Sequence, residues 1–207
     1  PRLLTPRETI LEQERTLTLE DKGDSRKYYV YVKGDVVYTT DQVADAITKA
    51  NENMGVVVGK DQEYIWKRSR EAIRPALSDI AVGAEDASSN SIAQCINAML
   101  EKEGINISVS ALIAGGETPK NILSNTMKDA RILDLTGCSV EEVLYYVSCG
   151  NPVFAMTGSD EAVLVVGYDA NNVIIFDPST GSNFKQSLTD ADEVFKEAGN
   201  VFFTYLK

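Results

Sequence analysis

The order of apolar segments in the second half of the chain restricts the fold class more than any other feature of the sequence. An amphipathic helix is expected at residues 92–100, and four strand-like segments follow it. These segments are rich in Val, Ile and Phe, are separated by turn sequences, and cover residues 153–156, 162–168, 173–178 and 201–206. A helix followed by consecutive strands is an α+β order, which disfavours a doubly wound parallel sheet. A capping box at Ser139 predicts one more helix, over residues 140–148.

The first part of the chain has a different pattern and predicts a smaller unit. The expected elements are a short helix at 5–15, a β-hairpin at 28–38, a helix at 41–53 that stops at Gly55, and strands at 56–58 and 63–66. We therefore expect an N-terminal helix and a small ββα-containing subdomain over residues 1–80, and a larger domain over residues 81–207. A linking helix, interrupted or begun near Pro75, is expected at residues 70–81, where the two parts meet.

Composition excludes several classes of partner. Twenty Lys and Arg against 31 Asp and Glu give a net charge of −11, which repels a phosphate backbone and an anionic bilayer. The one basic cluster, at residues 67–74, is interpreted as a solvated face, so no nucleic-acid binding is expected. No apolar run approaches the ~20 residues of a membrane span, so this fragment is not expected to insert into a membrane. Because the sequence begins at Pro1, we expect a piece of a longer protein, and its localisation is left open.

The chain contains no histidine. This absence removes the usual general base, the usual zinc ligand and the usual partner of a nucleophilic Ser or Cys. Three cysteines are an odd number without metal-ligand spacing, and we interpret them as buried free thiols. A disulfide between Cys138 and Cys149 is the alternative. No cofactor is expected.

Several motifs of the second half resemble the bacteriocin-processing type of papain-like cysteine peptidases. Ser91 stands thirteen residues before Gly104, where that family has its nucleophilic Cys at the start of a helix. Residues 150–153 resemble the family's Gly-x-Pro-Val sequence, and residues 161–169 and 173–181 resemble the strands that carry its catalytic His and Asp. The resemblance covers about three fifths of the chain and implies a papain-like fold, in which a helix packs on an antiparallel sheet.

The resemblance also implies roles for single positions. Ser91 stands at the nucleophile position, Glu161 at the general-base position, Asp177 at the position that orients the base, and Glu85 near the oxyanion-hole Gln. Only Asp177 is of the type found in active members. Thiol catalysis needs a thiolate and a base, so no catalytic residue is expected. Cys95, about one helical turn after Ser91, is interpreted as part of the core.

Two alternatives use the same positions. In an acid-active serine hydrolase, Glu161 would take the proton of Ser91 and share one with Asp177, because adjacent carboxylates can raise one pKa. An ionised Glu85 could not serve as the oxyanion donor in such a site. Alternatively, the three carboxylates could bind calcium or magnesium, but no calcium-loop spacing is present and no metal site is predicted.

The sequence thus predicts a pseudopeptidase, which is a non-catalytic papain-like binding or scaffold module. Its degenerate cleft would hold an extended peptide or another segment of its own parent protein, and a purely structural domain is the remaining possibility. The resemblance further implies a bacterial origin and an extracytoplasmic position in a longer envelope protein.

Overall fold

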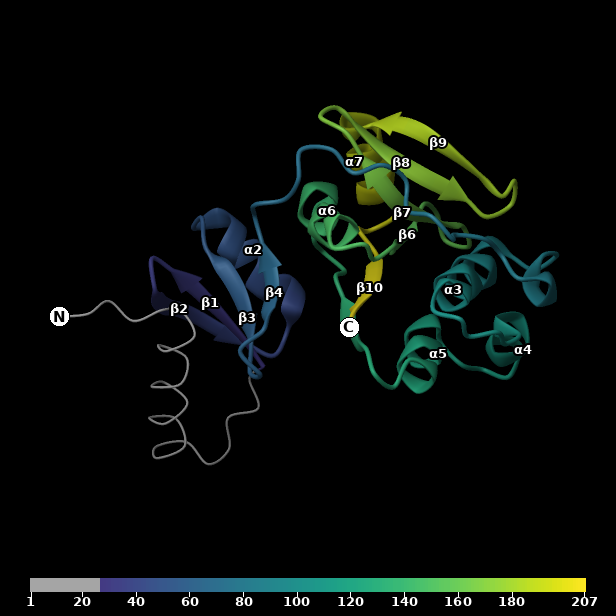
Figure 1. Ribbon diagram of the computed structural model, residues 1–207, viewed down its shortest axis with the longest axis horizontal. Helices are drawn as coiled ribbons and strands as arrows, with labels where there is room; N and C mark the ends of the chain where they lie inside the picture. The colour runs from purple at the N-terminus through teal and green to yellow at the C-terminus, as the bar shows by residue number, and fades with distance from the viewer. Residues whose placement is uncertain (1–26) are drawn as a thin grey trace. The chain divides into compact units, whose positions relative to one another are not determined.

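The computed structural model describes residues 27–207, which form two compact units (Figure 1). The first unit ends at Ser69 and the second covers Arg70–Lys207, whereas the sequence placed the boundary between residues 80 and 81. The helix predicted at residues 5–15 lies outside the described residues.

The first unit is a four-stranded antiparallel sheet with one helix. Its elements are β1 (Tyr28–Val32), β2 (Asp35–Thr40), α2 (Val43–Glu52), β3 (Val56–Gly59) and β4 (Tyr64–Lys67). The strand order is β2-β1-β3-β4. Lys33 and Gly34 connect β1 and β2 with φ angles of 53° and 96°, as a tight hairpin turn requires. The predicted hairpin, helix and two strands are confirmed.

The end of α2 differs from the prediction. Met54, with φ of 56°, takes the left-handed conformation after the helix, although Gly55 was the expected stop. Gly55 is needed for a different reason, because a Cβ there would lie 2.5 Å from the carbonyl oxygen of Tyr31. The glycine therefore permits a close approach of the chain to β1.

The second unit is built on a six-stranded antiparallel sheet with the order β5-β10-β6-β7-β8-β9. Its strands are β5 (Arg131–Asp134), β6 (Val153–Met156), β7 (Ala162–Tyr168), β8 (Asn172–Asp177), β9 (Ser182–Ser187) and β10 (Phe202–Leu206). The four predicted strands correspond to β6, β7, β8 and β10, with ends that agree within one residue. The unit is therefore α+β with an antiparallel sheet, as predicted.

The helices of this unit occupy both faces of the sheet. They are the 3₁₀-helix η1 (Ala84–Asp86) and the α-helices α3 (Ser91–Lys102), α4 (Val109–Ala114), α5 (Pro119–Thr126), α6 (Val140–Ser148) and α7 (Leu188–Glu197). Phe154 of β6 and Phe203 of β10 belong to the hydrophobic cluster that buries α3, with α4 and α5 beside it. Adjacent strand residues point to opposite faces, so Phe202 faces the other way. Its ring lies 5.3 Å from that of Phe195 in α7, which packs beside α6.

The prediction of a linking helix at residues 70–81 is wrong. Residues 70–82, here called the strap, contain no helix and run beside the end of β7. Arg74 and Tyr168 exchange two backbone hydrogen bonds of 2.8 Å, and the N–H of Leu77 donates to the carbonyl oxygen of Val166 at 2.8 Å. Pro75 disfavours helical geometry at the residue before it. The pairing of β6 with β7 ends at Val165, and the strap pairs with the part of β7 that follows.

The close approach of the strap depends on Gly167. A Cβ at this position would lie 2.8 Å from the carbonyl oxygen of Arg74 and 2.9 Å from the backbone nitrogen of Ala76. Both are backbone atoms, so a side chain would force the strap and β7 apart.

We therefore expect Gly167→Ala to lower the free energy of unfolding by about 2 kcal/mol, because overpacking a closely packed site costs roughly 1–3 kcal/mol. Urea denaturation of the full chain measures this change. Gly158→Ala is the matched control, since its Cβ would meet nothing nearer than 4.0 Å, and a change within about 0.5 kcal/mol is expected there. Equal losses in the two variants would contradict the explanation.

Candidate functional site

Ser91 is the first residue of α3 and contacts the start of β7. The side chain of Asn90 caps the helix by accepting the N–H of Ala93 at 2.9 Å. The hydroxyl oxygen of Ser91 accepts the backbone N–H of Ala162, the first residue of β7, at 3.0 Å. This hydrogen bond joins the beginning of the helix to the beginning of the strand.

Glu161 directly precedes β7, and its side chain is exposed. The turn before it is closed by the N–H of Thr157, which donates to the carbonyl oxygen of Glu161 at 2.9 Å. One carboxylate oxygen, Oε2, lies 4.0 Å from where a Cβ on Gly158 would stand. The carboxylate thus lies against its own turn.

Asp177 ends β8 at the same edge of the sheet, because Phe176 is paired with Leu164 near the start of β7. Its Oδ1 accepts the hydroxyl of Ser179 at 2.6 Å and the N–H of Ser179 at 2.9 Å, and its Oδ2 accepts the hydroxyl of Thr180 at 3.1 Å. The bond from the Ser179 side chain is the largest influence and holds the pKa of the Asp177 carboxyl below its usual 3.8, although burial opposes it. Asp177 is therefore an ionised acceptor within its own turn.

Glu85 lies in η1 with an exposed side chain. The neighbouring Asp86 is fully buried, and its carboxylate accepts the backbone N–H groups of Val109 at 2.7 Å and Ser110 at 2.8 Å. Asp86 thereby binds the loop before α3 to the first turn of α4. Sequence reasoning missed this residue, because no local motif marks an acceptor whose donors stand more than twenty residues away.

The structure brings Ser91, Glu161 and Asp177 to one edge of the second unit. Among residues 27–207, however, no hydrogen bond joins the side chains of any two of these three. No cluster of three or more His, Cys, Asp or Glu side chains suited to a metal ion occurs in the same part of the chain. The three residues therefore lie near one another without the contacts that proton transfer between their side chains would need.

The cysteines are all free, so the alternative Cys138–Cys149 disulfide is not formed. Cys95 and Cys138 are buried as predicted, but Cys149 is exposed and the prediction for it is wrong. Burial raises the pKa of the Cys95 thiol well above its usual 9.0, and the negative charge of Asp177 raises it further. A thiol in this environment stays protonated and is a poor nucleophile.

The difference in exposure predicts a simple pattern of thiol reactivity. One thiol per chain should react rapidly with a disulfide reagent in the native protein, and all three should react after unfolding. Replacing Cys149 by Ser should remove the rapid phase, whereas Cys95→Ser should leave it unchanged. Rapid native labelling that persists in the Cys149→Ser variant would show that a thiol we describe as buried is accessible.

No protein-family model and no curated protein matches the chain. A crystal structure of a candidate C39-like peptidase from Bacillus anthracis is similar, with 19% sequence identity over 70% of this chain and 98% of that chain and a TM-score of 0.48. At this level of similarity, neither an activity nor a site residue is transferred. None of the helices within residues 27–207 has the length and apolar character needed to cross a membrane.

Proposed function

We propose that the second unit is a non-catalytic module of papain-like type that binds a peptide segment without cleaving it. The observation that carries this proposal is the hydrogen bond from the N–H of Ala162 to the hydroxyl oxygen of Ser91. It gives the residue at the nucleophile position a structural role at the junction of α3 and β7. A chain without histidine offers no usual base to activate that hydroxyl.

The behaviour of the two carboxylates argues against the acid-active serine hydrolase. Such a site requires Glu161 and Asp177 to share a proton, which raises one pKa of the pair. The oxygens of Asp177 instead accept hydrogen bonds from Ser179 and Thr180, in the turn that follows β8. Within residues 27–207, no hydrogen bond joins the carboxyl groups of Glu161 and Asp177, so the pair lacks the contact through which a proton would be shared.

The charges around the start of α3 indicate the kind of peptide. Glu85, Asp160 and Glu161 are exposed, and Asp177 carries a negative charge at the same edge of the sheet. Complementary charge gives specificity and accelerates encounter, so a basic extended segment suits this edge better than an acidic one. The segment can belong to another protein or to the parent protein of this chain.

Fluorescence anisotropy with basic and acidic peptides of equal length tests this proposal. We expect the basic peptides to bind more tightly, and Glu161→Gln to weaken their binding by up to about fivefold, because a single exposed ion pair contributes ~0.2–1 kcal/mol. Glu193→Gln is the matched control, since Glu193 is exposed on α7, which covers the opposite face of the sheet from α3. No binding of any peptide, or equal effects of the two substitutions, would overturn the proposal.

A further inference from the structure

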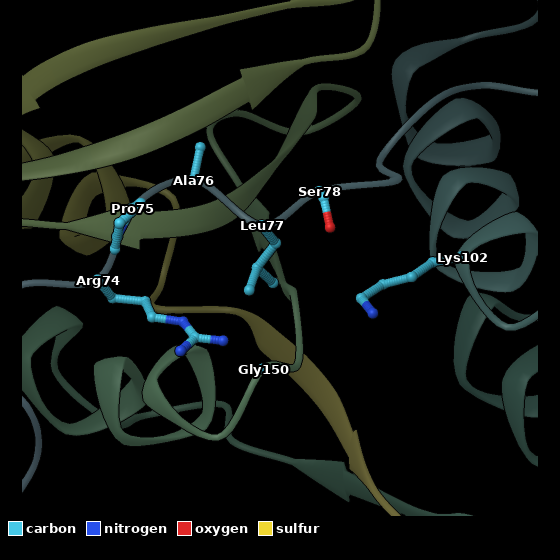
Figure 2. Close-up of a pocket in the computed structure, with 7 residues that line it drawn as sticks. All are labelled: Arg74, Pro75, Ala76, Leu77, Ser78, Lys102 and Gly150. Carbon is cyan, nitrogen blue, oxygen red and sulfur yellow. The ribbon is translucent and has the colours of Figure 1, made fainter.

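A pocket of about 410 Å³ lies at the other end of α3 from Ser91. One wall is formed by residues 74–78 of the strap, and Lys102 and Gly150 complete the lining (Figure 2). Ser91 and Lys102 are the first and last residues of α3, so about 16 Å of helix separates them. The pocket is therefore distinct from the edge that carries the degenerate-site positions.

Both charged residues of the pocket lining are cations, although the chain has 31 acidic against 20 basic residues. Figure 2 shows the guanidinium of Arg74 extending toward Gly150, and the amine of Lys102 extending into the pocket from α3 on the opposite side. The hydroxyl of Ser78 is directed into the same space. Two positive groups that face one space repel each other unless an anion lies between them.

Neither cation is fully neutralised by the protein. Within residues 27–207, Lys102 forms no ion pair, and the guanidinium of Arg74 pairs only with Glu71, whose Oε2 lies 3.8 Å from Nη1. That contact leaves Nη2 available to a ligand. The carboxylate of Glu103, next to Lys102, interacts with its charge but accepts hydrogen bonds from Tyr205 and Lys207. The hydroxyl of Ser78 donates to Asp79 at 3.0 Å, so it can donate to a ligand only if that bond is broken.

The backbone around the pocket is held in place before any ligand arrives. The N–H and the carbonyl oxygen of Arg74 both bond to Tyr168, and the N–H of Leu77 bonds to Val166. Lys102 belongs to a helix that the hydrophobic cluster of the sheet buries. Donors on a fixed frame lose less freedom on binding than donors on mobile loops, which favours affinity.

We propose that this pocket binds a small organic anion through a phosphate or carboxylate group. The guanidinium of Arg74 offers parallel N–H donors that match the oxygens of either group, and Lys102 adds a second positive charge. The volume exceeds that of a bare phosphate and lies in the range of small-molecule sites, and Pro75 and Leu77 provide apolar surface for the rest of the ligand. This site is independent of the proposed peptide binding.

Titration of the full chain, followed by ¹⁵N–¹H NMR at low ionic strength, tests the proposal with inorganic phosphate and with citrate as separate probes. Saturable shifts are expected for the amides of Leu77, Ser78 and Gly150. Stronger binding of phosphate would identify a phosphoryl ligand, and stronger binding of citrate a carboxylate ligand. Absence of saturable shifts at the pocket with both probes would overturn the proposal.

Substitutions then test the two cations. Arg74→Gln and Lys102→Gln should each weaken binding at least about tenfold, because a charge-assisted hydrogen bond is lost. Lys196→Gln removes an exposed lysine of α7 that pairs with Asp192 and should leave binding unchanged. Equal weakening in all three variants would show general charge attraction rather than a site. Lys102 lies at a helix end, so its variant tests the proposal even if Arg74→Gln alters the strap.

Discussion

The packing of α3 against β7 determines where both candidate sites of the second unit lie. At one end, the hydroxyl of Ser91 accepts the N–H of Ala162, so the helix and the strand begin together. At the other end, the strap pairs with Tyr168 and places Arg74 across a pocket from Lys102. Gly167 lets the strap approach, because a side chain there would contact its backbone. The acidic edge at the start of α3 and the basic pocket at its end are therefore held apart by the packing of α3 along β7.

The elements that sequence predicted best are those whose patterns are local and strong. β6, β7, β8 and β10 are apolar runs between turn signals, and the predicted capping box of α6 is present, with the side chains of Ser139 and Glu142 both bonded to the backbone. Two elements that were not predicted contain few apolar residues. β9 is a largely exposed edge strand of polar residues, and α7 buries only Ala191 and Phe195. Backbone pairing with β8, which a sequence pattern does not report, defines β9 more than burial does.

For the candidate site, the sequence predicted where the residues lie but not what their side chains contact. Sequence reasoning placed Ser91, Glu161 and Asp177 at ends of elements that the sheet brings to one edge. It could not predict what their side chains bind, because the partners are a distant backbone N–H for Ser91 and a turn formed after the strand for Asp177. The strap and its pocket were hidden for a related reason, since residues 70–81 have a helical pattern that Pro75 and pairing with β7 override.

We propose that this unit keeps the residue positions of a peptidase site but lacks the chemistry of one. The most direct test is hydrolysis of a broad fluorogenic peptide library from about pH 3 to about pH 8 by the full chain and by its Ser91→Ala variant, with an active cysteine peptidase as the positive control. We expect no turnover above the buffer background by either protein at any pH. Turnover that is present in the unmodified chain and lost in Ser91→Ala would contradict the claim and establish Ser91 as a nucleophile.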